Sequence, residues 1–377
     1  LARAFAQAEI TPHVEAWDAA AALPASLFDS LSELGFMGML VPEAYGGLDL
    51  DVPSYLVVVE ELARADAASA LAVSIQNGPV ASTLLEHGTE SQRDAWLPGL
   101  ASGECIGAFA LSEEGAGSDP AGVATTATRD GDEWVLNGTK KWVTNGARAG
   151  LLLVFARTGE RGELGCFLVP GGHAGLEVDG RTTTMGLRAS ETVGLRLNDV
   201  RLPGDSLVGR AGGGLGVALD ALTVGRAGIA AQAVGIAAAS LEHAVRYSRE
   251  REQFGRPLAD FGAIQAKLAE MGARTAAARA AVREVGARLQ RVRSGEGDDG
   301  VGEDSLVARV AGAKLVASET AMFASDEAVQ IFGGYGYMRD YPVEKLMRDA
   351  KGTEIYEGTS EIMRFVIARE IMRAADG

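Results

Sequence analysis

The spacing of apolar residues divides the chain into three parts, and the first part is helical. Apolar side chains recur at a helical period in residues 27–36 and again in residues 55–65. The proline- and glycine-rich stretch 42–47 predicts a loop between these two helices. Shorter helices are expected around 67–75, around 80–87, and from 89 to near Pro98. Residues 1–105 are therefore expected to form an N-terminal helical domain.

The middle part changes to short alternating or β-branched runs, which are typical of strands. Strands are expected at residues 124–129, 133–136, 141–144, 151–156, 165–169 and 192–197. The pair Asn137-Gly138 predicts a hairpin turn between two of them, because both residues tolerate positive φ. This spacing predicts that residues 106–212 form a middle β domain, a small antiparallel sandwich or barrel.

The last part returns to helices. Residues 219–289 are rich in Ala, Leu, Arg and Glu, and they predict two long helices broken near residues 255–257. A third helix is expected at 305–331, and a last helix from about residue 360. Residues 213–377 are therefore expected to form a C-terminal helical bundle domain, which makes the chain an α+β protein.

Composition excludes several classes of protein. Of the 377 residues, 47% are hydrophobic and 23% are charged, which is ordinary for a globular protein with a substantial core. The net charge of −16 argues against nucleic acid or an anionic membrane as a partner, since either needs a basic face. There is no run of about 18 apolar residues, so no membrane span is expected, and residues 1–7 lack the profile of a signal peptide.

Cysteine and histidine usage narrows the chemistry further. The two cysteines, Cys105 and Cys166, form neither a disulfide framework nor a zinc pattern, which indicates a reducing compartment such as the cytoplasm. The four histidines are scattered without metal-ligand spacing. Neither a metal site nor a Ser-His-Asp triad is therefore expected.

Two stretches in the β part could bind a flat or phosphorylated ligand. In residues 109–119 a strand runs into a loop of small residues, whose backbone N–H groups could approach a phosphate or a heteroaromatic ring. A tight loop between two domains would explain this stretch about equally well. Strand alternation places Trp142 and Thr144 on one face, where an indole and a hydroxyl could meet a flat ligand. A buried pair inside the sheet is the commoner explanation.

Three stretches in the helical part raise the same question. Arg251 could pair with a pyrophosphate, or it could belong to a charged helix face. Three glycines in residues 333–336 exceed the need of a helix C-cap and are compatible with a ligand or a partner chain. Glu357 is followed by Gly358 and by Thr359, which suits an N-cap. Taken alone, residues 353–361 favour an ordinary helix start.

Taken together, these stretches resemble the acyl-CoA dehydrogenase family. Five motifs carry the resemblance in order along the whole chain: FALSEEGAGSD (109–119), WVTNG (142–146), REREQFGRPL (249–258), QIFGGYGY (330–337) and IYEGTSE (355–361). The resemblance implies an N-terminal all-α domain, a middle antiparallel β-sandwich and a C-terminal four-helix bundle. It also implies a non-covalent FAD and a homo-oligomer, usually a tetramer built as a dimer of dimers.

The resemblance also implies roles for individual residues. The loop and the strand face should surround the flavin ring, with the Thr144 hydroxyl near flavin N5. The expected FAD-binding residues are Phe109, Leu111, Ser112, Gly117, Ser118, Trp142, Val143, Thr144, Arg251, Phe254, Gln330, Ile331, Gly333, Gly334, Thr359, Ser360 and Glu361. Residues 330–334 should reach the FAD of a neighbouring subunit. The expected acyl-CoA-binding residues are Ser118, Arg226, Tyr356 and Gly358.

By the same resemblance, Glu357 is the catalytic base. It would remove the α-proton of an acyl-CoA thioester while flavin N5 accepts the β-hydride, which yields the trans-2-enoyl-CoA. The electrons would pass to an electron-transfer flavoprotein. Some members place the base just before the arginine equivalent to Arg226, but this chain has Gly225 there. Thr223 stands where short- and medium-chain members often have aspartate.

Three other interpretations share this resemblance. An acyl-CoA oxidase or a flavin monooxygenase relative would keep the fold and use O₂ in place of an electron-transfer flavoprotein. Monooxygenase relatives tend to lack the catalytic glutamate, so Glu357 argues against them. A non-catalytic homologue would either contain no flavin or contain a flavin that no thioester reduces.

Overall fold

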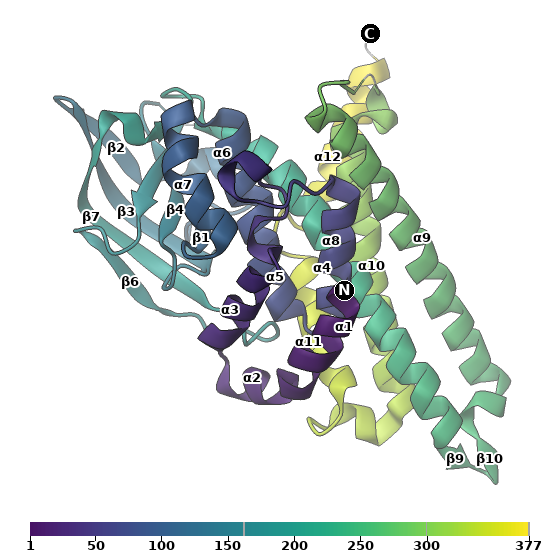
Figure 1. Cartoon of the computed structure of the whole chain (residues 1–377). Helices are drawn as coiled ribbons and strands as arrows, with labels where there is room; N and C mark the ends of the chain where they lie inside the picture. Colours follow the sequence, from purple (N-terminus) through teal and green to yellow (C-terminus); the bar gives the residue numbers. More distant parts are fainter. Residues whose placement is uncertain (161–162, 299, 376–377) are drawn as a thin grey trace.

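The computed structural model describes residues 1–160, 163–298 and 300–375, and it consists of one large sheet, a set of N-terminal helices and a set of C-terminal helices (Figure 1). The sheet lies on one side of the molecule. Three long helices, α8 (Gly214–Glu250), α9 (Gly262–Arg293) and α10 (Leu306–Phe332), lie on the other side, and the N-terminal helices pack between. This arrangement confirms the predicted order of a helical part, a β part and a helical bundle.

The N-terminal part contains seven α-helices among the described residues: α1 (Ala2–Phe5), α2 (Val14–Ala20), α3 (Ala25–Glu33), α4 (Val52–Ala65), α5 (Ala67–Ile75), α6 (Ser82–His87) and α7 (Glu90–Ser102). The expected apolar helix at 27–36 stops earlier, at Glu33, because Gly35 adopts a left-handed φ of 72°. Pro98 does not end α7 but lies inside it. Thr89 and Gln92 form a capping box at its start.

The segment between α5 and α6 joins the helices to the sheet. It is a π-helical turn, Gln76–Ala81, so helix-like structure continues from Ala67 to His87. The buried Gln76 amide donates to the carbonyls of Leu100 and Cys105 and accepts from the Gly107 N–H. These bonds hold the first strand against the helices, because each would leave a buried polar group unpaired if broken.

The described part of the middle region is an eight-stranded sheet. Its strands are β1 (Gly107–Ala110), β2 (Thr126–Asp130), β3 (Glu133–Thr144), β4 (Leu151–Arg157), β5 (Leu164–Pro170), β6 (Leu176–Arg181), β7 (Thr192–Pro203) and β8 (Leu207–Val208). The order is β6-β7-β3-β2-β4-β5-β8, and β1 pairs in parallel with β4. The remaining ladders are antiparallel, apart from one parallel bridge between β2 and β4.

Strand β4 is buried on both faces. Leu151, Leu153 and Phe155 belong to the core shared with the helices, whereas the alternate residues, Leu152 and Val154, belong to the interior of the sheet domain. This is why residues 151–156 form a continuous apolar run instead of an alternating one.

The predicted hairpin at Asn137-Gly138 is wrong. Both residues lie inside β3, and the β2–β3 turn is instead at Gly131-Asp132. Gly138 adopts a φ of 151°, and a Cβ there would stand 2.7 Å from the Thr125 Cα. The glycine therefore permits a close backbone approach at a register shift in the β3–β7 ladder, which is another use of the same residue type.

The C-terminal part confirms two long helices with a break around residues 255–257. The short strands β9 (Glu252–Gln253) and β10 (Arg256–Pro257) form a hairpin in that break. After α10 come α11 (Pro342–Thr353), which the sequence pattern did not predict, and α12 (Ser360–Ala375). The turn between α11 and α12 contains Glu357.

Helix α8 is long and apolar enough to span a membrane by length and composition alone, whereas no such stretch was expected. In the fold, 83% of its most apolar window is buried against other parts of the chain. That burial is typical of a central core helix.

The boundaries proposed near residues 105 and 212 stay predictions. They fall between α7 and β1 and between β8 and α8.

Candidate active site

Glu357 lies in a left-handed turn whose backbone carbonyls are bound by two cationic side chains. Its φ is 56°, and that of Gly358 is 96°. The Arg226 Nε donates to the Glu357 carbonyl oxygen over 3.1 Å, and the Lys314 Nζ donates to the Gly358 carbonyl oxygen over 2.7 Å. A left-handed backbone is unusual for a residue with a side chain and has to be stabilised by its surroundings.

One oxygen of the Glu357 carboxyl group is removed from water. The Oε2 atom is buried and has no hydrogen-bond partner in the described chain. Burial raises the pKa of Glu357 to about 7, although nearby Arg226 and Lys314 act in the opposite direction. A carboxylate with such a pKa can both accept and release a proton near neutrality, which a general base requires.

Two glycines leave room around this carboxyl group. A Cβ at Gly225 would stand 2.7 Å from the Glu357 Oε2, so no larger residue fits there without moving the carboxyl group. A Cβ at Gly78 would lie 3.7 Å from the Gly225 Cα and 3.3 Å from the hydroxyl of the buried Tyr55. The π-helical turn of Gly78 therefore packs directly against α8 beside the base.

Tyr356 is fixed by a hydrogen bond to α8. Its hydroxyl donates to the Gln232 Oε1 over 2.7 Å, and burial raises its pKa well above the usual value. Gln232 in turn donates to the Ala67 carbonyl at the start of α5. The side chain of Tyr356 therefore turns into the core, while Gly358 remains next to the Lys314 ammonium.

The loop in residues 109–119, which is expected to contact the flavin, is fixed by a buried ion pair. Lys140 Nζ lies 2.7 Å from the Glu113 carboxylate and donates to the Leu111 carbonyl. Glu113 also accepts from the N–H groups of Ala124 and Thr125. Burial lowers the pKa of Lys140 to about 8, against the opposite effect of Glu113. These contacts fix residues 111–113 against β3, whereas Gly117 and Ser118 are exposed.

Trp142 is not part of a buried pair. Its side chain is 54% exposed and its φ is 57°, at a register shift between Lys140 and Val143. Val143 is buried and Thr144 is half-buried. The Lys141 N–H donates to the Ser112 carbonyl, which brings the expected flavin loop beside this irregular strand end. An exposed indole on a strained backbone is typical of a ligand-binding surface.

A second set of expected FAD-binding residues lines a separate groove of about 470 Å³. Arg251, Ile331, Gly333 and Gly334 are among its lining residues, and the Arg251 guanidinium lies 5.6 Å from the ring centre of Tyr335. Arg251 follows the end of α8, so it does not belong to a charged helix face. No other atom of the described residues lies within 4 Å of a Cβ built at either glycine.

This groove is far from the sheet. It lies beside β9 and β10, which Figure 1 places at the end of the helical bundle away from the sheet. Phe254, in the β9–β10 turn, is 94% exposed. The residues of this groove therefore lie apart from the expected site residues on the sheet.

The start of α12 confirms the predicted cap. The Thr359 Oγ1 accepts a hydrogen bond from the Ile362 N–H. The hydroxyl of Ser360 is buried without a partner in the described chain, whereas Glu361 is exposed.

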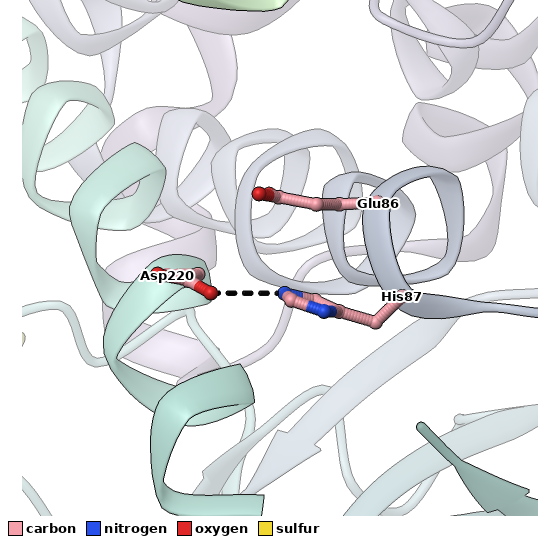
Figure 2. Close-up of side chains that lie close together, drawn as sticks. All are labelled: Glu86, His87 and Asp220. Carbon is pink, nitrogen blue, oxygen red and sulfur yellow. Dashed lines mark ion pairs between the residues drawn. The ribbon is translucent and has the colours of Figure 1, made fainter. Parts of the chain in front are cut away.

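One histidine has acidic neighbours that the sequence did not indicate (Figure 2). Ligand atoms of Glu86, His87 and Asp220 lie within 4.8 Å of one another, and the His87 Nε2 is 3.1 Å from the Asp220 Oδ2. Glu86 and Asp220 are exposed. The contact between His87 and Asp220, drawn as a dashed line in Figure 2, accounts for this arrangement. Asp220 comes from α8, far along the chain, so no local spacing could have predicted it.

Sequence reasoning missed several residues around the base, including Lys314, Tyr55 and Gln232. The available signal was a single lysine among the small, apolar residues of α10, in the stretch AGAKLVAS. A lone charge on an otherwise apolar helix face is compatible with a buried functional group.

Comparison with known protein families gives three matches that together cover nearly the whole chain. They are the N-terminal, middle and C-terminal domains of acyl-CoA dehydrogenase, at residues 1–104, 108–200 and 212–372. An acyl-CoA dehydrogenase of Bacillus subtilis is 40% identical over 99% of this chain and 96% of its own length. The mitochondrial short-chain specific acyl-CoA dehydrogenase of Bos taurus is 41% identical over 99% of this chain and 88% of its own.

Solved structures give the same result. Butyryl-CoA dehydrogenase from Megasphaera elsdenii superimposes with a TM-score of 0.94 at 38% identity, over 99% of this chain and 96% of that one. A structure described as the electron transferring flavoprotein of Acidaminococcus fermentans matches with a TM-score of 0.94 at 39% identity, over 99% and 96%. A glutaryl-CoA dehydrogenase from Mycobacterium smegmatis in complex with FADH2 has a TM-score of 0.89 at 33% identity, over 98% and 92%.

Proposed function

The chain belongs to the acyl-CoA dehydrogenase family, and from this premise we propose that Glu357 is the base that removes the α-proton of an acyl-CoA thioester. The protein is an oxidoreductase acting on acyl-CoA, and FAD is its cofactor. One observation carries the proposed role. A buried carboxylate oxygen without a partner, in a group whose pKa is about 7, stands against a glycine that leaves its approach free.

The residues around Glu357 suit proton abstraction. An acyl chain that covers the carboxyl group would exclude water and keep the pKa of this group raised. No described residue accepts a hydrogen bond from the Glu357 N–H. This N–H is therefore available to hold the thioester carbonyl oxygen, which carries negative charge after the proton has left. Arg226 keeps this part of the backbone in place.

The chain also contains residues that are suited to binding a flavin. We assign the exposed Trp142, the half-buried Thr144 and the loop of Gly117 and Ser118 to one flavin-binding surface, which is supported by the Lys141–Ser112 backbone bond and the Glu113–Lys140 pair. When bound, FAD supplies the acceptor for the β-hydride. We assign Phe109, Leu111, Ser112 and Val143 to the same part of the FAD site, and Ser118, Arg226, Tyr356 and Gly358 to acyl-CoA.

The remote groove supports a site shared between subunits. The groove that contains Arg251 and Gly333 lies beside β9 and β10, at the end of the helical bundle away from the sheet (Figure 1), which supports the proposal that it binds the FAD of another subunit. We assign Arg251, Phe254, Gln330, Ile331, Gly333 and Gly334 to the FAD of a neighbouring subunit, and Thr359, Ser360 and Glu361 to the FAD near the start of α12. A dimer is then the smallest active unit, and a tetramer made of two such dimers follows the family.

We further propose that electrons leave to an electron-transfer flavoprotein and that the enzyme works in the cytoplasm. The likeness to the Acidaminococcus fermentans structure supports the first proposal. The two cysteines, Cys105 and Cys166, are free, which suits a reducing compartment.

The direct test is anaerobic bleaching of the flavin absorbance by acyl-CoAs of graded length and branching. Reduction by wild-type enzyme and its loss in Glu357→Gln, by roughly 1,000-fold or more, is the expected result. Glu354→Gln is the matched control, because Glu354 lies in the same turn and pairs with the exposed Lys351. Substantial reduction by Glu357→Gln would contradict the role of the base, and thioester-dependent peroxide in air would indicate an oxidase.

A further inference from the structure

We propose that Lys314 is a positioning residue for Glu357: with Arg226 it holds two successive carbonyls of the left-handed turn and so aims the carboxyl group at the substrate. The inference rests on the proposed role of Glu357 as the base. Lys314 lies on α10, Arg226 lies on α8, and the turn runs between α11 and α12. Three separate elements therefore meet at the backbone of the base.

Among the described residues, Lys314 forms no ion pair that would explain why a charged side chain is buried here. The side chain is 0% exposed, and no carboxylate lies within ion-pair distance of it in the described part of the chain. Among the described residues, the Gly358 carbonyl is the one hydrogen-bond acceptor of the Lys314 ammonium. A buried ammonium without an ion-pair partner is costly, and an apolar residue of the same length would be the stabilising choice. A lysine here therefore points to function.

The backbone of the turn needs such support. Glu357 has a positive φ of 56°, which is an unfavourable backbone conformation for a residue with a side chain. Two hydrogen bonds from charged donors to the carbonyls of Glu357 and Gly358 offset that cost. Without them the turn could relax to an ordinary backbone conformation, which would swing the carboxyl group away from Gly225.

The lysine acts on the base without neutralising it. Because its ammonium binds a carbonyl and not the carboxylate, the Glu357 Oε2 stays free to take a proton. The positive charge nevertheless counters the effect of burial on the pKa of Glu357, together with Arg226. The charge of Glu357 also raises the pKa of two further groups, the hydroxyls of Tyr55 and Tyr356.

The pKa of Lys314 lies close to that of Glu357. Burial lowers its pKa to about 8, and Arg226 acts in the same direction. Glu357, Glu354 and Glu361 oppose this effect. The negative charge of Glu357 raises the pKa of Lys314, and the positive charge of Lys314 lowers the pKa of Glu357, so each group favours the charged form of the other.

The test compares the FAD-loaded variants Lys314→Met and Lys314→Gln by single-turnover flavin reduction with one acyl-CoA across pH. Met removes both the charge and the hydrogen bond, whereas Gln removes the charge and keeps a donor for the Gly358 carbonyl. We expect the apparent pKa of the rate to rise by about one unit in both variants. The limiting rate at high pH should fall about tenfold in Met and much less in Gln, with acyl-CoA binding changed less than threefold.

Lys267→Met is the matched control, because Lys267 lies on α9 and pairs with Glu327. It should keep both the wild-type pKa and the limiting rate. If Lys314→Met does not retain FAD, the test is made with Lys314→Gln alone. Wild-type pH profiles in the Lys314 variants would overturn the inference.

Glu357→Gln separates this inference from the proposed function. If Glu357→Gln retains flavin reduction, the proposed base is wrong and Lys314 has no base to position. If Glu357→Gln abolishes reduction while the Lys314 variants keep the wild-type profile, only the inference about Lys314 fails.

Discussion

The turn of Glu357 and the groove of Arg251 are both expected to serve one FAD-dependent reaction, yet they are built in opposite ways. Around Glu357, α8 and α10 meet the turn between α11 and α12, one carboxyl oxygen is buried, and Arg226 and Lys314 bind consecutive carbonyls. Around Arg251, two glycines have no neighbour within 4 Å of a Cβ, and Phe254 is 94% exposed.

The difference shows which part of the site one chain can complete. A proton-abstracting group must be held in a fixed orientation and a fixed dielectric, so its surroundings are tightly determined. A groove that receives part of a neighbour's cofactor needs only a matching surface, and its open glycines and exposed aromatic ring are compatible with a partner that covers them. Three experiments test this contrast.

The largest effect is expected from crowding the base. In Gly225→Ala the new Cβ would stand 2.7 Å from the Glu357 Oε2, so the carboxyl group has to move. A displacement of this size should lower the rate of flavin reduction about 100-fold, with FAD retained. Gly216→Ala is the control, since it lies on the same helix with nothing within 4 Å of its Cβ. Equal activity of the two variants would show that Glu357 does not work in this position.

A shared site predicts complementation between two damaged subunits. Glu357→Gln removes the base, and Arg251→Gln weakens the groove that we assign to the neighbour's FAD. In a hybrid dimer, both changes fall on one site and leave the other intact, so a random mixture of co-expressed, differently tagged chains should recover about a quarter of wild-type activity. If each FAD is bound within one chain, every hybrid site has one defect, and no activity should return.

The smallest effect is expected from pH, and it acts on the closed site alone. Burial raises the pKa of Glu357 to about 7, and proton abstraction requires the ionised form. The rate of flavin reduction should therefore rise about tenfold from pH 6 to pH 8 and then level off. FAD binding measured by fluorescence over the same range should change little. A flat rate profile would show that a group other than Glu357 limits the reaction.

The expected fold followed from patterns that are local in sequence, whereas the expected site residues followed from the resemblance to the acyl-CoA dehydrogenase family. Helical periodicity identified the long helices α8, α9 and α10, and the glycine-rich stretches marked where the backbone stays open. The same local reasoning placed a turn at Asn137-Gly138, which the structure uses inside β3. A glycine indicates a backbone that needs freedom, but not whether the cause is a turn or a close neighbour.

The residues that surround the base could not be predicted in this way. Lys314, Tyr55 and Gln232 come from three helices and have no spacing in common. The ion pair of Glu113 and Lys140 is likewise made by two segments that meet only when the loop packs against β3. Each contact depends on how separate elements pack, and the periodicity of one element contains no information on that.

By itself, the sequence determined the order of helical and β parts, the family, and the presence of a glutamate next to a glycine near the end. Tertiary structure alone decided what that glutamate can do. Packing of α8 and α10 around the turn buries one oxygen of the Glu357 carboxyl group, brings two cations to the backbone carbonyls of the turn and puts Gly225 next to the carboxyl group. The pKa of a carboxyl group depends on the charges and the solvent within a few ångströms of it, and in this protein those neighbours are brought there by folding.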